Sequence, residues 1–414
     1  MNVLLIAYYT PPLLSGGSHR PLQIAGYLRN RGHRVTILTS SYRGSDQFDP
    51  GNEIRIHDPS HNLNRRGKYQ VFFWMRRIGV EIGNRLGTTA SIYGRWKRRI
   101  VQSAPAILEK TRPDCLLASY PPLEDLETGL FLSRQFSVPL ISDFRDGLLF
   151  EPIESHRLHR FPVLQKHYRR LEQQIVRESS HIITASAPIT RYFQERYRRE
   201  AQTLLNGYQG ECKKMTFRSL ASSDPASPFR IIHTGQWKLS DAGIDIRPFF
   251  GGIRRLLRDH PALADRLRIH LAGRLSAPEK NLIRDLVRSG VVIQHGPVSH
   301  PRALRLQQTA DLLLTITSPN RKSTISSKFF EYLRAGRPIL ALTAGTEQER
   351  ILRETGAGWH CPPDHIDSIA RLLGQIIRRP GFYRSLSPDP AALERYRFEN
   401  QARILDRILA GKKT

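Results

Sequence analysis

Two series of alternating strand-like and helix-like segments constrain the fold of this chain more than any other feature. Short apolar runs recur in the first half at 2–9, 34–40, 115–119, 139–144 and 181–186. They recur in the second half at 229–235, 267–273, 291–296, 311–317 and 338–342. Segments with helical periodicity lie between them, a pattern typical of parallel strands covered by helices on both faces. We therefore predict an α/β fold with two doubly wound, Rossmann-like halves.

A segment rich in serine and proline, 215–228, separates the two series. Its composition is that of an interdomain linker. We predict a first domain over 1–210, a linker over 211–228 and a second domain over 229–390. A helical pattern over 391–414 is expected to pack back on the first domain.

The charge of the chain points to an anionic partner. The 414 residues carry a formal net charge of +27 with a pI of about 10.6, which suits nucleic acid, a phospholipid surface or a phosphorylated small molecule. The excess of arginine also fits a purely compositional origin. Three isolated cysteines, without metal-ligand spacing, indicate reduced thiols and a cytoplasmic protein. No run of eighteen apolar residues occurs, so any membrane contact is expected to be peripheral.

The stretch SSKFFEYLRAGRPILAL, residues 326–342, is punctuated as a helix followed by a strand. Serines suited to an N-cap precede it, and Gly336 fits the position after its end. With Ser327 as N-cap, Glu331 falls at N4, one position beyond the N3 position that a capping box requires. A functional carboxylate and one favoured by the helix dipole both remain open.

Other candidate residues follow predicted strands, where loops lead into helix N-termini that favour anions. Gly16 and Gly17 would allow close approach of a ligand after the first strand, or form an ordinary loop. Asp143, Arg145 and Asp146 end another strand, as a substrate-positioning cluster or a local ion pair. In the second half, candidates for a diphosphate are Gly235, Lys238, Arg247, Ser326, Ser327 and Lys328, each also compatible with a surface role.

These features together resemble the nucleotide-sugar glycosyltransferases of the GT-B fold, family 4. The resemblance rests on the two halves, the Gly-Gly loop, DFRD at 143–146 and above all SKFFEYLRAGRPILAL at 327–342. It implies two domains facing a central cleft, with Glu331 accepting hydrogen bonds from the ribose of the donor. Family members commonly carry a further glutamate eight positions earlier, where this chain has Ser323, and a glycine where it has Ser327.

The resemblance implies transfer of a hexose-like sugar from a nucleoside diphosphate to an acceptor hydroxyl, with retention of configuration, in polysaccharide or glycolipid assembly. Arg247 and Lys238, with the amides near Ser326 and Ser327, are expected to stabilise the leaving diphosphate. Asp143, Arg145 and Asp146, with Gly16 and Gly17, are expected on the acceptor and sugar side. The resemblance thus implies an acceptor-side first domain and a nucleotide-sugar-binding second domain. No DxD motif is present, and we predict no metal and no cofactor.

A basic segment with interleaved aromatic residues, 65–112, suits an anionic bilayer and a lipid-linked acceptor. A basic surface over an aromatic core face is the alternative. We therefore expect a cytoplasmic protein, peripheral at the inner face of the plasma membrane. Two other functions stay open: a nucleotide-sugar epimerase of the same general fold, and a basic nucleic-acid-binding protein, although no nucleic-acid recognition motif is found.

Overall fold

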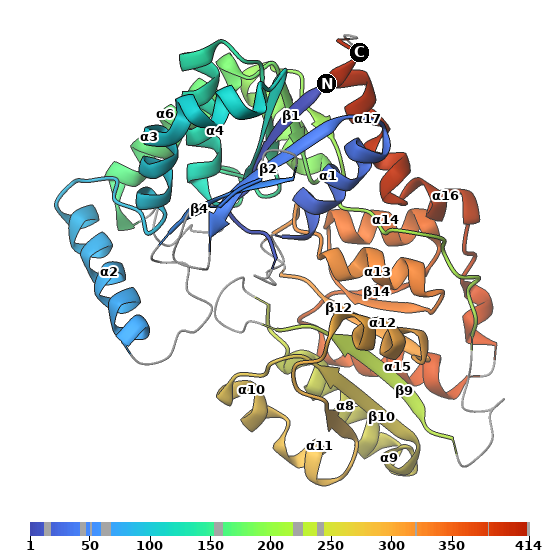
Figure 1. The fold of residues 1–414 in the computed structure, drawn as a ribbon. Helices are drawn as coiled ribbons and strands as arrows, with labels where there is room; N and C mark the ends of the chain where they lie inside the picture. The colour runs from blue at the N-terminus through green and yellow to red at the C-terminus, as the bar shows by residue number, and fades with distance from the viewer. Residues whose placement is uncertain are drawn as a thin grey trace. The chain divides into compact units, whose positions relative to one another are not determined.

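The computed structural model of the chain describes residues 1–11, 18–41, 47–49, 52–58, 68–152, 160–217, 227–237, 244–318, 321–379 and 381–411. By its internal contacts the chain divides into two compact units, Met1–Leu205 with Ala402–Thr414, and Asn206–Gln401. Each unit contains one sheet covered by helices (Figure 1). The predicted roles of the two parts, acceptor-side and nucleotide-sugar-binding, stay predictions.

The sheet of the first unit has eight strands in the order β3-β4-β2-β1-β5-β6-β7-β8. They are β1 (Asn2–Ile6), β2 (Arg34–Ser41), β3 (Gln47–Asp49), β4 (Glu53–His57), β5 (Cys115–Tyr120), β6 (Leu140–Phe144), β7 (His181–Thr184) and β8 (Gln202–Thr203). Every neighbouring pair is parallel except β3 and β4. The order of the strands reverses at β1, and in open α/β sheets ligands bind beside such a reversal, at the carboxyl ends of the strands.

Helices connect these strands. They are α1 (His19–Asn30), α2 (Lys68–Arg85), α3 (Gly94–Thr111), α4 (Leu123–Phe136), α6 (Pro162–Glu178) and α7 (Ala187–Tyr197). The last helix, α17 (Phe398–Leu409), reaches the first unit, where the Asp406 carboxylate accepts hydrogen bonds from Tyr27 Oη at 2.7 Å and Arg31 Nη2 at 2.9 Å. The C-terminal end of the chain therefore contacts α1.

The sheet of the second unit has six parallel strands in the order β11-β10-β9-β12-β13-β14. They are β9 (Phe229–Thr234), β10 (Leu267–Ala272), β11 (Val292–Gln294), β12 (Leu312–Ile316), β13 (Ile339–Leu342) and β14 (Gly358–Cys361). Its helices are α8 (Arg247–Asp259), α9 (Leu263–Arg266), α10 (Ala277–Leu282), α11 (Arg284–Arg288), α12 (His300–Gln308), α13 (Ser327–Ala335), α14 (Glu347–Thr355), α15 (Ile366–Arg378) and α16 (Pro390–Arg395), with the 3-10 helix η1 (Phe382–Ser385). Here the strand order reverses between β9 and β12.

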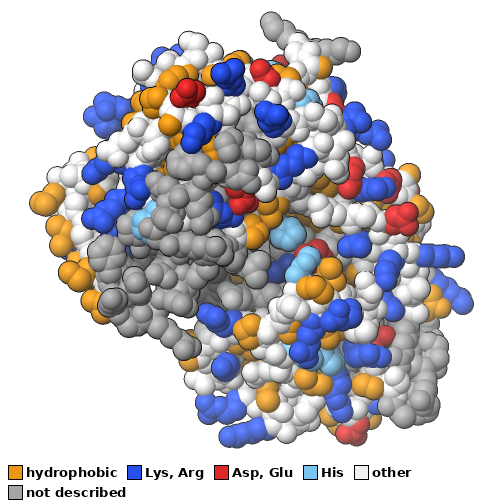
Figure 2. Space-filling view, viewed as in Figure 1, with side chains coloured by type: hydrophobic (Ala, Val, Ile, Leu, Met, Phe, Trp, Pro, Cys, Tyr) orange, Lys and Arg blue, Asp and Glu red, His pale blue; other side chains and the backbone are white. Residues whose placement is uncertain are grey.

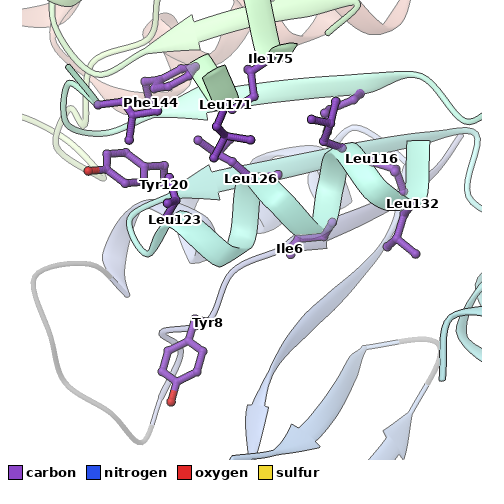
Figure 3. Close-up of a cluster of buried hydrophobic side chains, with 14 of the residues drawn as sticks. Ile6, Tyr8, Leu116, Tyr120, Leu123, Leu126, Leu132, Phe144, Leu171 and Ile175 are labelled. Atoms are coloured by element: carbon purple, nitrogen blue, oxygen red, sulfur yellow. The ribbon is translucent and has the colours of Figure 1, made fainter. Parts of the chain in front are cut away.

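Each unit buries its own hydrophobic core, formed by strand residues and by one apolar face of each covering helix. In the first unit, Ile6 and Leu116 of the sheet pack in one cluster with Leu126 and Leu171 of the helices (Figure 3). In the second unit, Ile231 of β9 belongs to the same cluster as Phe249 of α8. Two separate cores explain why the sequence shows two series of apolar runs.

The predicted fold class is confirmed, and the local differences have simple causes. The structure adds β3, β4, β8 and β14, which are short and contain polar residues, to the predicted strands. The predicted C-terminal helix is divided into α16 and α17 at Tyr396 and Arg397. Half of the predicted linker 211–228, residues 218–226, lies outside the described residues.

Candidate functional site

Helix α13 presents the carboxylate that the sequence singled out. Its N-cap is Ser326, one residue earlier than predicted, so Glu331 lies one position farther into the helix than expected. The Ser326 side chain makes no capping hydrogen bond. At the other end Gly336 is left-handed, with φ of +66°, as its predicted position requires. Buried Phe329 and Phe330 fix the helix against the core, which leaves Glu331 on a partly exposed face.

Two donors of α12 hold the Glu331 carboxylate. Gln307 Nε2 donates to Oε2 at 2.9 Å, and His300 Nε2 lies 3.0 Å from Oε1. Gln307 Nε2 also donates to Thr234 Oγ1 at 3.0 Å, which connects this carboxylate to the end of β9. Sequence reasoning missed both α12 residues, although a spacing of seven places His300 and Gln307 on one face of a helix.

The Lys328 ammonium lies against the backbone of Gly235, where β9 ends. A Cβ atom at Gly235 would stand 1.8 Å from Lys328 Nζ, and the φ of +110° is itself unfavourable for other residues. Burial lowers the pKa of Lys328, although the nearby Glu331 carboxylate acts in the opposite direction. Within the described residues Nζ makes no hydrogen bond. The arrangement brings together three predicted residues, Gly235, Lys328 and Glu331, around a cation suited to an anionic ligand.

The neutral imidazole of His233, one residue before the end of β9, lies near the Lys328 charge. The Nδ1 atom of His233 lies 2.9 Å from Leu314 O, and its ring stacks on Trp237 with centroids 4.2 Å apart. Burial, with a smaller contribution from the Lys328 charge, lowers the pKa of His233 to about 3. His233 is therefore uncharged near neutral pH, so Lys328 supplies the positive charge at the end of β9.

Of the two other cations predicted for the diphosphate, only Arg247 lies within the described residues. Lys238 lies outside the described residues. Arg247, the first residue of α8, is 73% exposed and pairs with Asp245 at 2.7 Å. No hydrogen bond or ion pair in the described part of the chain joins Arg247 to Lys328 or Glu331. Its predicted role with the diphosphate would require it to leave Asp245.

In the first unit, Asp143 is engaged by a buried arginine. The Nε atom of Arg20 donates to both Asp143 oxygens, at 3.0 and 2.9 Å, and Nη2 donates to Oδ1 at 2.7 Å. Ser119 Oγ donates to Oδ2 at 2.6 Å, and Arg20 Nη1 donates to Leu204 O at 2.6 Å. Both charged side chains are at most 2% exposed. These contacts connect α1, β5, β6 and the exit from β8, and they argue for a structural role of Asp143 rather than substrate contact.

Two other candidates of the first unit, Arg145 and Asp146, follow Asp143 closely in the chain. Arg145 donates from Nε to Tyr120 O at 3.1 Å and from Nη2 to Pro121 O. Burial lowers the pKa of the Arg145 guanidinium, while the neighbouring Asp143 opposes that shift. Asp146 follows on a partly exposed turn. Gly16 and Gly17 lie outside the described residues, so their predicted contact with a ligand stays a prediction.

Sequence reasoning missed a small pocket beside the first turn of α4. The pocket has a volume of about 220 Å³, and Tyr9, Tyr93, Glu124, Glu127 and His167 are among its lining residues. Burial raises the pKa of Glu124 to about 7, although a hydrogen bond with Ser91 acts in the opposite direction. The paired acids in PPLEDLE, directly after β5, were a usable signal because they fall at a strand's carboxyl end.

Comparison with known proteins supports the resemblance. A family described as "Glycosyl transferase 4-like domain" matches residues 15–208. Residues 15–208 are therefore similar to a glycosyltransferase family 4-like domain. A Pseudomonas aeruginosa protein named "Probable glycosyltransferase WbjE" is 43% identical over 53 residues, a match that spans only 13% of this chain and 13% of that relative. This agreement confirms the predicted family resemblance for the matched residues.

Solved structures extend the likeness beyond residues 15–208 to nearly the whole chain. Anabaena Alr3699/HepE, in complex with UDP and glucose, has a TM-score of 0.59 at 15% identity and covers 99% of each chain. A Listeria monocytogenes protein named as a UDP-N-acetylglucosamine 2-epimerase has a TM-score of 0.58 at 11% identity, covering 99% of this chain and 96% of its own. At these identities the likeness establishes the GT-B-like fold alone. Within the described residues, none of the helices has the length and hydropathy that crossing a bilayer requires.

Proposed function

We propose that the chain is a glycosyltransferase that moves a sugar from a nucleoside diphosphate sugar to an acceptor hydroxyl. One observation carries the proposal: Glu331 and Lys328 present an oriented carboxylate and a half-buried ammonium beside Gly235, at the carboxyl edge of the second sheet. A ribose diol and a diphosphate supply the complementary groups, since hydroxyls donate to a carboxylate and phosphate oxygens accept from an ammonium.

The α12 donors make Glu331 selective for hydroxyl groups. Gln307 and His300 already donate to its two oxygens, which fixes the carboxylate while each oxygen keeps acceptor capacity. A bound ligand without the hydroxyls would cover the carboxylate and leave that capacity unpaired, at a cost of about 1–3 kcal/mol. Ser323, in place of the family's further glutamate, is buried, so we assign the sugar contact to other residues.

Charge on the departing diphosphate requires cationic and amide donors in this proposal. Lys328 and the first amides of α13, at Ser327 and after, are suited to this task because a helix N-terminus favours anions. Lys238 and Arg247 remain proposed additional donors. We propose an oxocarbenium-like transition state, as in other glycosyl transfers, and retention of the anomeric configuration. We also propose that cationic side chains of the protein neutralise the charge on the diphosphate.

The acceptor side is proposed for the first unit, in polysaccharide or glycolipid assembly at the inner face of the plasma membrane. Arg145 and Asp146 are the candidates for acceptor contact, while Asp143 acts through Arg20 to position the end of β6. Two alternatives make different predictions: an epimerase would convert the free donor sugar, and a nucleic-acid-binding protein would bind DNA with a steep salt dependence.

A panel of nucleotide sugars tests the proposal. Each is incubated with the protein and assayed for hydrolysis, for epimerisation and for a rise in the unfolding temperature. We expect at least one to be hydrolysed slowly and to stabilise the fold, with no epimerised donor recovered. Stabilisation by none of the panel, or accumulation of the epimer, would contradict the proposed transfer.

A further inference from the structure

Helix α2 carries an apolar stripe that the protein itself does not cover. The stripe consists of Val71, Trp74, Met75, Ile78 and Ile82, followed directly after the helix by Leu86. Each of these side chains is between 51% and 79% exposed. Spacings of three and four residues place them on one side of the helix. Figure 2 shows hydrophobic side chains gathered along the edge of the molecule where Figure 1 draws α2.

The opposite side of α2 is attached to the first unit, so the stripe is held outward. Asn84 is buried, and a Cβ atom at Gly83 would meet Thr88 Oγ1 at 2.7 Å. Arg76 Nη1 reaches the buried Asp58 carboxylate at 3.2 Å. These contacts fix the rotation of the helix about its axis. Contiguous exposed apolar surface of this kind usually marks an interaction site.

The surroundings of the stripe are strongly basic. Over residues 68–112 the sequence has ten basic and two acidic residues: Lys68, Arg76, Arg77, Arg85, Arg95, Lys97, Arg98, Arg99, Lys110 and Arg112 against Glu81 and Glu109. Arg77 lies over the Trp74 ring at 5.6 Å, and exposed Arg85 follows on the same helix. A hollow of about 610 Å³ beyond the end of α2 is lined by Arg95 and Arg98 among others.

We propose that the α2 stripe and its flanking arginines dock the protein on an anionic phospholipid bilayer. Amphipathic helices with basic polar faces lie in the interface with their apolar side in the headgroup and acyl boundary. Arginine charges add attraction to anionic lipid, which salt screens. The occupant is a bilayer rather than a protein groove, because Arg77 and Arg85 lie on the same helix as the exposed apolar side chains.

The structure separates two interpretations of the basic aromatic segment. Trp96 of α3 is completely buried and Lys97 pairs with Glu127 at 2.8 Å, so α3 is a basic surface over an aromatic core face. Trp74 and Ile78 of α2 are exposed, which is the bilayer pattern. If the proposed transfer function holds, docking through α2 favours a lipid-linked acceptor, whose anionic headgroup would enter the hollow lined by Arg95 and Arg98.

Sedimentation with vesicles tests the docking. Vesicles of phosphatidylglycerol and phosphatidylcholine in equal parts are mixed with the wild-type chain and with the triple variant Trp74→Ser, Ile78→Ser, Ile82→Ser. We expect the triple variant to bind about tenfold or more weakly, and high salt to weaken wild-type binding. The control variant Leu22→Ser, Ile366→Ser removes exposed apolar side chains elsewhere and should bind as the wild type does.

Three outcomes would overturn the docking: no wild-type binding at low salt, equal binding by the triple variant, or a wild-type dimer that becomes a monomer in the triple variant without any vesicle binding. The last outcome would assign the stripe to contact between copies of the chain. Nucleoside diphosphate binding in solution should be unchanged in the triple variant. Because that readout is independent of vesicles, failure of the docking and failure of the proposed transfer are distinguishable.

Discussion

Two carboxylates near the carboxyl edges of the two sheets have opposite surroundings. Asp143 is completely buried and its oxygens receive three hydrogen bonds from Arg20 and one from Ser119. Glu331 is 19% exposed and receives one from Gln307 while contacting His300. The Asp143 carboxylate has its oxygens occupied by buried donors, whereas the Glu331 carboxylate has few donors and is partly exposed, so it remains available to a ligand. Both residues looked functional in the sequence, and their partners now distinguish them.

The largest effect is expected from breaking the buried pair. Asp143→Ala removes the carboxylate that neutralises the buried Arg20 guanidinium, which should lower the free energy of unfolding by about 3–5 kcal/mol, measured in urea. The control Asp259→Ala removes one carboxylate of an exposed pair with Arg255 and should change stability by no more than about 1 kcal/mol. A stable Asp143→Ala protein that has lost transfer would instead make Asp143 a catalytic residue.

A smaller effect is expected on the ligand side, at Lys328. Lys328→Met removes a charge-assisted donor from the proposed diphosphate site, so UDP should bind with about 1.5–3 kcal/mol less free energy while uridine is little affected. Calorimetric titration of both ligands measures the difference. Lys280→Met, at an exposed lysine of α10, is the matched control. Equal weakening of UDP and uridine would place Lys328 away from the phosphates.

Glu124 extends the comparison, because it is buried like Asp143 and burial is the largest influence on its pKa. The pKa of Glu124 in the folded state is about 7, above the ordinary value of 4.5. Between pH 4.5 and pH 7 the carboxyl group is therefore protonated in the folded state and ionised in the unfolded state. Stability should therefore fall as pH rises from about 4.5 through 7. At pH 8 Glu124→Gln should be more stable than wild type by about 2 kcal/mol, with a flatter pH profile. Glu109→Gln, at an exposed position, should leave the profile unchanged.

The smallest change in stability is expected for Arg247, whose pair with Asp245 is exposed. If Arg247 leaves that pair to stabilise the departing diphosphate, Arg247→Ala should lower the rate of transfer more than it lowers donor affinity. Steady-state kinetics with a donor and acceptor measure both. Arg258→Ala, farther along α8, controls for loss of surface charge. Lost affinity with an unchanged rate would assign Arg247 to ground-state binding.

The two-sheet fold was predictable because most of the buried strands appear as short apolar runs. Strand β14 was not predicted, because GWHC is short and mixes polar with apolar residues. The sequence also singled out Gly235, Lys328 and Glu331, which lie close together in the structure, and their contact with a donor stays a prediction. Side-chain partners from distant segments were not predictable. Arg20 reaches Asp143 across 123 residues, and no local pattern in α1 indicates that contact.

The carboxylate of Glu331 provides the most direct test of the account. UDP, GDP, ADP and dTDP are titrated by calorimetry into the wild type, into Glu331→Gln and into Glu211→Gln, a control at an exposed glutamate of the same unit. We expect at least one of these nucleotides to bind the wild type and the Glu211→Gln control with equal affinity. Glu331→Gln should bind that nucleotide with about 1–3 kcal/mol less free energy and unchanged thermal stability, because the ribose acceptor becomes in part a donor. Equal affinity for all three proteins, or no binding of any nucleoside diphosphate, would contradict the assignment of this site to a nucleotide sugar.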